Sequence, residues 1–450
     1  MRSSALAAAL ALAACASPAR DARDAYVIDT LAEDNYMWAL RDPSTVAMKL
    51  TLMQESPFLW LRGTAPVFWR DLTTPGVDRP ATRFGDPASS RVLLVADPHP
   101  ENLGSFRAPD GTMLIDFDDF DGAGYGPFEG DVRRLAAGMI IAANGAGPTP
   151  EDLASAVATA YAAQIADLAN GVAPAAGTAP YLDKLIAKAQ ANGDAHKELA
   201  DDVASPGVLE TGDLDPIDSF GVIQNRVEPI ATTEHDEVTA ALAPLLAAHP
   251  ELGAIEDIGR RYGHGVSSYP AWRYLVLLAG ETSSPGDDRV LEIKEERDGL
   301  DVENVPQLDA AEWSTPAARA VNTAHRLWLR PDEDPLWGAA NLAPLSLVTH
   351  DDSAYQRGVD SGDLGDLASS DPDQLLAVAG VFGRLLARAH GLALTEDGVL
   401  GWTAIAPVLG DGFPDEVASF ASADAAQIIA DYQSFAGRDL PSLVLPAVHQ

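Results

Sequence analysis

The chain has 450 residues and a formal charge of −37, because 67 acidic residues outnumber 30 basic ones. Such a charge repels a nucleic-acid duplex and an anionic membrane surface, which argues against nucleic-acid binding. Apolar residues make up 47% of the chain, and it is long enough for a large core in two lobes. Beyond the N-terminus no segment has 18 consecutive apolar residues, so no later transmembrane helix is predicted.

The first residues have the form of a bacterial lipoprotein signal peptide. Arg2 is followed by a run of Ala and Leu to Ala14 that is too short to span a bilayer. Cleavage before Cys15 would leave this residue as a lipidated N-terminus, so we expect an extracytoplasmic, lipid-anchored protein. Ala16 favours the outer membrane in a Gram-negative host. The alternatives are an ordinary signal peptide cleaved elsewhere or a start site placed too early. Since Cys15 is the only cysteine, no intrachain disulfide or thiolate metal site can form.

Composition and periodicity divide the rest of the chain into segments. We predict a signal peptide over 1–14, a tether over 15–25, a mainly helical segment over 26–90, a helical part with the catalytic loop and metal site over 91–250, a β-rich nucleotide-binding part over 251–360, and returning helices over 361–450.

Two apolar runs followed by acidic residues give the main functional indication. The run over 92–95 reads as a strand and is followed by Asp97, with Asn102 five residues later. A second run over 113–115 is followed by Asp116. Protein-kinase-like phosphotransferases use this arrangement: the first Asp accepts the proton of the attacking hydroxyl, and the Asn and the second Asp hold the Mg²⁺ that bridges the nucleotide phosphates.

Each of these residues has a functional and a structural interpretation. We expect Asp97 to be the catalytic base, with a loop cap as the alternative. His99 is expected to orient the loop by hydrogen bonding, and a metal-ligand role is its alternative. Asn102 and Asp116 are the expected Mg²⁺ ligands, with Asp118 as a further ligand or as support for the others. The structural alternative is turn capping at strand ends, which is also what we expect of Asp119 and Asp121.

Further along the chain, the sequence predicts helices and then strands. Asp131 and Arg134 are expected to be structural, at a helix N-terminus and in an ion pair. The hydroxyl of Thr149 before Pro150 predicts a helix start, and Asn170 followed by glycine predicts its end. His390, on an apolar helix, is expected to be a core histidine.

A glycine-rich turn and two strands follow at about residue 255. Gly263, Gly265 and Ser267 precede a strand over 272–278, and after a polar turn a second strand carries Lys294. Glycines let backbone N–H groups approach phosphate oxygens, and a Lys on a neighbouring strand can pair with the phosphates. We therefore expect these four residues to bind the nucleotide, although the Gly-x-Gly pattern taken alone favours ordinary turn glycines. Glu303 and Glu312 are the two candidate ion-pair partners of Lys294, and the spacing does not choose between them.

These parts have the order of a circular permutant. In ordinary kinases the glycine-rich loop and the Lys strand precede the catalytic loop, whereas here they follow it. The helix over 381–390 resembles the one that precedes the catalytic loop in aminoglycoside phosphotransferases. A chain opened between that helix and the catalytic loop would explain the order.

The chain also resembles a bacterial family known only as domain of unknown function 2252. The motifs that carry this resemblance are Ser56-Pro57-Phe58, Asp97-x-His99-x-x-Asn102-x-Gly104, Asp116-Phe117-Asp118-Asp119-Phe120-Asp121, Ile293-Lys294-Glu295 and Leu386-Ala387-Arg388-Ala389-His390. It covers residues 50 to 435 and implies a protein-kinase-like fold without implying an activity. Ala96 stands where the family usually has Gly, and Gly130 stands where it usually has Trp.

The sequence therefore predicts an α+β protein with a two-lobed, circularly permuted kinase-like fold. We expect it to use ATP and Mg²⁺ to transfer a phosphoryl or nucleotidyl group to an unidentified hydroxyl acceptor. A calcium loop starting at Asp116 fails because Pro127 occupies the position that needs a bidentate Glu. A metal-dependent hydrolase would leave Lys294 unexplained. The main alternative is a secreted kinase-like lipoprotein that binds a ligand or partner and transfers nothing.

Overall fold

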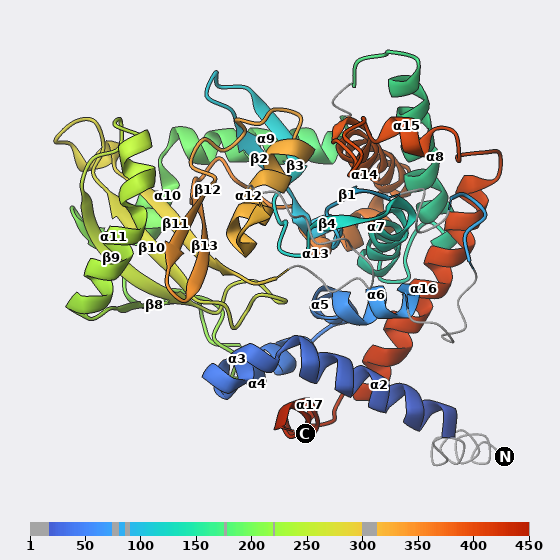
Figure 1. Cartoon of the computed structure of the whole chain (residues 1–450), viewed down its shortest axis with the longest axis horizontal. Coiled ribbons are helices and arrows are strands. Elements are labelled where there is room, and N and C mark those ends of the chain that lie inside the picture. The colour runs from blue at the N-terminus through green and yellow to red at the C-terminus, as the bar shows by residue number, and fades with distance from the viewer. Residues whose placement is uncertain are drawn as a thin grey trace.

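The computed structural model confirms the α+β fold class. Figure 1 shows a β-rich part on the left and a helical part on the right. The described residues are 18–73, 81–85, 91–174, 178–218, 221–298 and 313–449. Cys15, Glu303 and Glu312 lie outside these ranges, so lipidation of Cys15 and the pairing of Lys294 with either glutamate stay predictions.

Helices occupy both ends of the chain and the stretch that follows the catalytic-loop motifs. The N-terminal helices are α2 (Pro18–Asp34), α3 (Tyr36–Arg41), α4 (Pro43–Leu52), α5 (Pro57–Gly63) and α6 (Ala65–Thr73). The central helices are α7 (Phe128–Ala142), α8 (Pro150–Ala169), α9 (Pro180–Asp194), α10 (Lys197–Asp202), α11 (Thr232–Ala248) and α12 (Pro316–Leu327). The C-terminal helices are α13 (Ser361–Ser370), α14 (Pro372–Leu392), α15 (Trp402–Ile405), α16 (Phe413–Phe435) and α17 (Leu440–Val444).

The β-rich part is a seven-stranded antiparallel sheet in the order β12-β13-β11-β10-β9-β8-β7. Its strands are β7 (Gly212–Asp213), β8 (Arg226–Pro229), β9 (Ile255–Tyr262), β10 (Arg273–Leu278), β11 (Arg289–Glu296), β12 (Gly338–Leu342) and β13 (Leu345–Asp351). The strands predicted over 272–278 and at Lys294 are therefore the neighbours β10 and β11, with Lys294 opposite Arg273.

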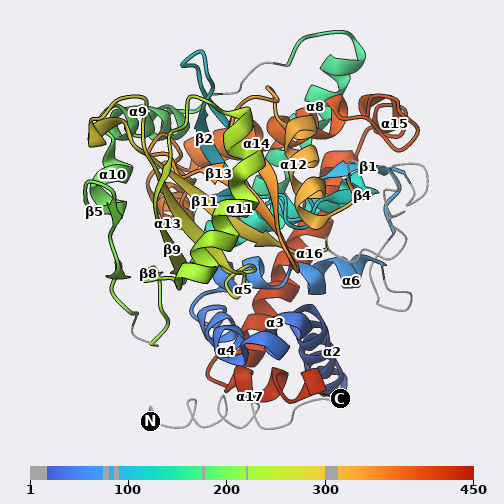
Figure 2. The same ribbon diagram turned by 60° about the vertical axis from the view of Figure 1, so that its left-hand side comes forward.

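The two faces of this sheet have different roles because side chains alternate along each strand. On β10, Tyr274 and Val276 pack with Val238 of α11, which covers one face (Figure 2). The opposite face carries Leu275 and Leu277. Towards the first residues of β10, the same face carries charged side chains. This second face therefore presents Lys294 to the helical part.

Helices α7, α8, α14 and α16 form the main core. Phe128 of α7 stacks on Tyr161 of α8 with ring centroids 5.9 Å apart. Thr149 and Asp152 form a capping box at the start of α8, which confirms the predicted helix start. Of the helices in the described ranges, only α14 is apolar and long enough to cross a membrane, and most of it is buried inside the protein. A core helix satisfies the same test.

Two short hairpin-like pairs join the helical core to the sheet. Strand β1 (Arg91–Leu94) pairs with β4 (Gly124–Pro127), and β2 (Leu103–Arg107) pairs with β3 (Met113–Phe117). The N–H of Ser105 on β2 donates to the carbonyl of Arg357 at 3.1 Å, and the N–H of Val359 donates to the carbonyl of Leu103 at 2.8 Å. The chain segment between β13 and α13 is thus attached to the catalytic-loop region.

The N-terminal helices connect both parts of the molecule. The Arg23 guanidinium on α2 lies 2.6 Å from a carboxylate oxygen of Asp71 and 2.6 Å from one of Asp431, which joins α2 to α6 and α16. Arg41 at the end of α3 pairs with Glu295 of β11 at 2.6 Å. Helix α3 is therefore attached to the strand that carries Lys294.

Candidate functional site

The loop after β1 places Asp97 between the helical core and the sheet. The buried carboxylate of Asp131 on α7 accepts the N–H of Val95 at 2.9 Å and the N–H of Ala96 at 3.1 Å. The Trp69 indole N–H donates to the carbonyl of Ala96. These bonds hold the backbone on one side of Asp97, so the expected structural role of Asp131 agrees with its contacts.

Asp97 is paired with Arg134 and largely buried. The Arg134 guanidinium lies 2.8 Å from Asp97 Oδ1, which is the ion pair expected for Arg134. Burial raises the pKa of Asp97 to about 6, against the opposing effect of Arg134, and the negative charge of Asp119 adds to the rise. A carboxylate in this range can accept a proton near neutral pH.

Ala96 occupies a backbone conformation that favours glycine. Its φ is 71°, in the left-handed region, at a position where the resemblance described above implies Gly. We expect Ala96→Gly to stabilise the protein: relief of about 1–2 kcal/mol of backbone strain exceeds the roughly 0.8 kcal/mol lost with one buried methyl. Urea unfolding should show a net gain of up to about 1 kcal/mol. Ala108→Gly, at a buried position without a positive φ, should be destabilising. Equal losses in both variants would contradict this account.

Gly130, the second position where the chain departs from the pattern that the resemblance implies, lies against Trp69. A Cβ built on Gly130 would lie 2.4 Å from the Trp69 ring. The indole of Trp69 therefore fills the space beside α7 that a larger residue at position 130 would need. This departure concerns packing.

His99 and Asn102 lie on the same loop and are buried. The Asn102 side-chain amide donates to the Asp97 carbonyl at 2.9 Å, closing the loop between them. The His99 ring contacts Phe58 edge-on with centroids 5.9 Å apart. Across the described part of the chain, Nδ1 of His99 has no hydrogen-bond partner, and burial lowers the pKa of its imidazole well below the usual range. Its observed contact is ring packing rather than the expected hydrogen bond.

Asp116 lies within β3 rather than after it. Strand β3 continues to Phe117, so Asp116 sits opposite Gly104 and its side chain is buried. The Arg388 guanidinium contacts both carboxylate oxygens, at 2.5 and 2.6 Å, and the N–H of Leu329 donates to Oδ2 at 3.1 Å. The strand was predicted to end at residue 115, two residues too early, because the charge of Asp116 reads as a strand end, whereas Arg388 compensates that charge. Its role as a metal ligand stays a prediction, and in this arrangement both of its oxygens are already engaged.

Glu333 completes a buried acidic pair with Asp116. Burial raises the pKa of Glu333 to about 9, and the Asp116 charge adds to the rise. The protonated form of the Glu333 side chain is therefore favoured near neutral pH. Arg388 lies against the carboxylate of Asp116 and compensates its charge.

Glu333→Gln should change how stability depends on pH. A carboxyl whose pKa is higher in the folded state binds a proton more tightly there, so wild-type stability should fall as pH rises from about 4.5 to 9. Glutamine cannot titrate. The free energy of unfolding of Glu333→Gln, relative to that of the wild type, should therefore increase as pH rises across this range. Urea titrations of both proteins at several pH values measure it. A difference that does not vary with pH would contradict the raised pKa of Glu333.

Three further acidic residues, Asp118, Asp119 and Asp121, follow β3. Burial raises the pKa of Asp118 to about 7 and that of Asp119 to about 6, and in each case a neighbouring aspartate increases the rise. Oδ1 of Asp119 also accepts the N–H of Asp121 at 3.1 Å, which is the expected turn cap. Asp119 and Asp121 have a second role that sequence reasoning missed.

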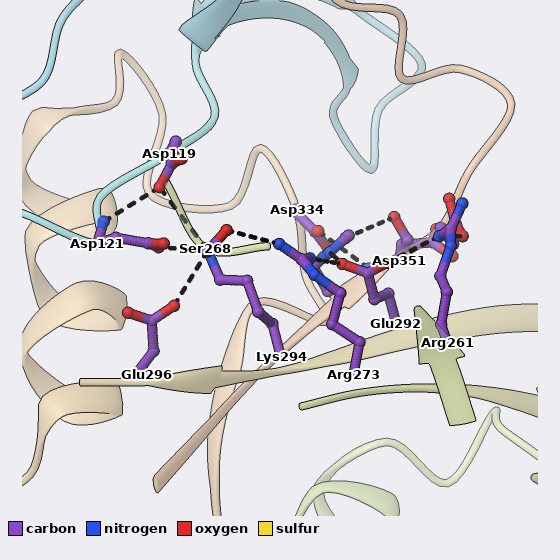
Figure 3. Close-up of polar contacts among 12 residues, drawn as sticks. Asp119, Asp121, Arg261, Ser268, Arg273, Glu292, Lys294, Glu296, Asp334 and Asp351 are labelled. Carbon is purple, nitrogen blue, oxygen red and sulfur yellow. Dashed lines mark hydrogen bonds and ion pairs between the residues drawn. The ribbon is translucent and has the colours of Figure 1, made fainter. Parts of the chain in front are cut away.

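That second role is the ion pairing of Lys294. Figure 3 shows Lys294 rising from β11 towards Asp119 and Asp121, with Glu296 beside it on the same strand. Lys294 Nζ contacts Asp121 closely and lies 3.7 Å from Asp119 Oδ1 and 3.1 Å from Glu296 Oε1. These three acids raise the pKa of Lys294 against the effect of burial, so its ammonium stays charged. The acidic partners come from the loop after β3 and from its own strand.

Arg319 on α12 holds this acidic loop in place and was not predicted. Its guanidinium donates to the carbonyls of Ala123 and Asp121 at 2.8 Å each and to that of Arg297 at 2.9 Å. Helix α12 therefore joins the acidic loop to the end of β11. The contacts are to backbone carbonyls, which leave no recognisable pattern in the sequence.

A second charged cluster lies beside Lys294 on the same face of the sheet. Glu292, two residues before Lys294, accepts from Arg273 at 2.5 Å and from Arg261 at 2.8 Å (Figure 3). His350 lies 3.2 Å from Glu292, whose charge raises the imidazole pKa to about 9. The surface next to Lys294 is therefore charged and internally neutralised rather than apolar.

The glycine-rich turn lies between β9 and β10, next to this cluster. Gly263 and Gly265 each have a φ of 76°, and a Cβ on Gly263 would lie 2.4 Å from the carbonyl of Ile223. Both glycines are therefore required by the turn itself. Ser268 accepts from Arg273 at 2.8 Å, and Ser267 lines the cleft.

The predicted site residues from the two parts meet at one small cleft. Asp97, Asp119, Asp121 and Ser267 all line it. Its volume is about 30 Å³, so the two parts are closed on each other. Within the described ranges, no group of three or more His, Cys, Asp or Glu side chains is arranged to hold a metal ion.

Sequence comparison agrees with the motifs. The profile of a family described as "Uncharacterized protein conserved in bacteria (DUF2252)" matches residues 41–438. The chain belongs to this family. The match includes both strand motifs and Lys294 but begins at the last residue of α3, so α2 and nearly all of α3 precede it. No curated protein and no solved structure matches the chain.

Proposed function

We propose that this member of the DUF2252 family is a kinase-like phosphotransferase with a circularly permuted chain order, which moves a phosphoryl group from Mg-ATP to a hydroxyl. The observation that carries the proposal is the ion pairing of Lys294 with Asp119 and Asp121. Lys294 is 173 residues from Asp121 along the chain, and it reaches the loop that directly follows β3. A strand lysine, acidic residues after a β-hairpin and a buried Asp are the components that phosphoryl transfer needs.

The residues present fit a magnesium ion with bound phosphates. Mg²⁺ is usually held by one or two carboxylates together with substrate phosphates and waters, so a complete protein cage is not required. Asp118 and Asp119 are the carboxylates we assign to it, with Asn102 beside them. Burial, and after it a neighbouring aspartate, raises the pKa of each carboxyl. Bound Mg²⁺ would compensate the charge of these carboxylates and that of the phosphates.

Asp97 supplies the proton acceptor in this scheme. The acceptor hydroxyl oxygen forms a bond to the γ-phosphorus while its proton passes to the Asp97 carboxylate. The bond between the γ-phosphorus and the bridging oxygen breaks, and ADP leaves. Arg134 keeps the Asp97 carboxylate in position through the contact at 2.8 Å.

One feature differs from ordinary kinases. There the strand lysine pairs with a glutamate on the neighbouring helix. Helix α12, which contacts β11 and β13, has no acidic residue. Glu296 on β11 takes that place at 3.1 Å from Lys294.

A non-catalytic binding protein is the second candidate. The cleft of about 30 Å³ is far too small for a nucleotide, and Glu292 with its arginines occupies the surface beside Lys294. Phosphoryl transfer therefore requires the two parts to separate. A protein in which they stay closed would bind its ligand elsewhere.

Thermal unfolding with Mg-ATP separates the two candidates. Ligand at a hundred times its Kd stabilises the folded state by about 2.7 kcal/mol, so the midpoint should rise by a few degrees. Lys294→Ala and Asp119→Asn should lose this rise, whereas Lys184→Ala, at an exposed position on α9, should keep it. No rise in the wild type at millimolar Mg-ATP would reject the nucleotide site and favour the binding protein.

A further inference from the structure

A much larger cavity lies on the other side of Lys294's strand. Its volume is about 810 Å³, within the range of sites for small organic ligands. Helices α3 and α6 form one wall, and the start of α11, strands β10 and β11 and the β12–β13 turn form the other. Figure 2 shows α3 below the sheet and α11 across it.

Part of this cavity is built by chain that precedes the family match. Thr30, Met37 and Trp38 line it from α2 and α3, before residue 41. Met37 is 73% exposed although it is apolar, so its side chain is free to contact a ligand. The N-terminal helices therefore add a wall to a site that begins within the family domain.

The charged groups of the cavity leave a negative surplus. Its four arginines are all paired: Arg41 with Glu295, Arg70 with Glu33, Arg260 with Glu234 and Arg297 with Asp34. Glu237 and Asp298 also line the cavity, are exposed, and have no ion pair in the described part of the chain. Two carboxylates thus remain for a ligand, in a protein whose formal charge is −37. A cation is favoured at such a surface both at contact and during approach.

Apart from two threonines, the rest of the lining is apolar or aromatic. Trp69, Tyr274 and Leu345 contribute to it together with Met37. A small hydrated metal ion would leave this surface exposed to water, whereas an organic cation with an apolar body would cover it.

The cavity adjoins the cleft that contains Asp97. Trp38, Glu295, Arg297 and Asp298 line both spaces. A ligand held at Asp298 therefore lies next to the space that Asp97 and Asp119 border. A hydroxyl on such a ligand would be directed towards the proposed base.

We propose that this cavity binds an organic cation with an apolar body. The further assignment of this ligand as the hydroxyl acceptor rests on the proposed function, but the binding itself does not. Helices α2 and α3 then help to determine which acceptor is bound.

Calorimetric titration of the full chain with a matched pair of probes tests the proposal. The first probe is propranolol, an amine with a hydroxyl and a naphthyl body. The second is its neutral glycol analogue, in which a hydroxyl replaces the amine. We expect propranolol to bind about tenfold more tightly than the glycol. The double variant Glu237→Gln with Asp298→Asn should lose this preference, whereas Glu151→Gln with Asp366→Asn, at exposed sites away from the cavity, should retain it.

A second pair of variants locates the binding. Thr233→Trp fills the cavity and should abolish binding of both probes. Thr232→Trp changes the adjacent exposed residue, which is not part of the lining, and should leave binding unchanged. Equal affinity for both probes, no binding of either, or binding that survives Thr233→Trp would overturn the proposal. The Mg-ATP unfolding shift, measured on the same samples, reports separately on the proposed function.

Discussion

Asp97→Asn is expected to lower ATP turnover by about 10²- to 10⁴-fold, the usual effect of losing a general base. Asparagine has the same shape but cannot accept the proton at this pH. Arg134 keeps a second acceptor, the carbonyl of Leu61 at 2.6 Å, so the fold should survive. Basal ATP hydrolysis, with water as the acceptor, measures the effect before the true acceptor is known.

The pH profile gives this prediction a second readout. The base acts in its ionised form, and the pKa of Asp97 is raised to about 6. Turnover in the wild type should therefore rise as pH increases through about 6 and then level off. The residual turnover of Asp97→Asn should lack this rise.

Asp110→Asn, at an exposed residue of the same region, serves as the control. Turnover within threefold of wild type in Asp97→Asn, with an unchanged unfolding midpoint, would remove Asp97 from the mechanism.

Arg388→Met is expected to lower the free energy of unfolding by about 3–5 kcal/mol, the usual cost of removing one partner of a buried ion pair. The side chains of Arg388 and Asp116 are 4% and 1% exposed. Without the guanidinium, the negative charge of Asp116 would remain buried and would lose the cation that compensates it. Chemical denaturation at neutral pH measures the loss.

A matched control lies on the same helix. Arg384 of α14 is exposed, so Arg384→Met makes the same chemical change without removing a buried charge and should cost well under 1 kcal/mol. Adding Asp116→Asn to Arg388→Met removes the uncompensated charge and should recover part of the stability. A double variant as unstable as the sum of the two single ones would show that the pair does not interact.

If the protein transfers phosphate, the closed cleft implies a moving part. Arg41 with Glu295 and Arg297 with Asp34 connect the N-terminal helices to the end of β11. Any opening of the cleft has to preserve these pairs or break them. The helices at the N-terminus would then either travel with the sheet or restrain it.

Features set by neighbours along the chain were predictable from the sequence. Thr149 forms the expected cap because its partner, Asp152, is three residues away. Strand β10 is a continuous apolar run, and β11 alternates apolar with charged side chains, so their pairing across a short polar turn could be expected. The α+β class follows from such local patterns. His390 was correctly expected in the core, where it lies between Tyr161 at 2.9 Å and Asp131 at 3.1 Å.

Features that depend on charge compensation were decided only by the tertiary structure. Asp116 reads as the end of a strand until Arg388, 272 residues later, is seen to neutralise it. The partners of Lys294 were sought downstream of it, yet the described ones are on its own strand and in a loop far upstream. Arg319 could not be foreseen, because it binds backbone carbonyls, which every residue has. Coulombic and hydrogen-bond partners are chosen by distance in space, and only packing brings such distant segments together.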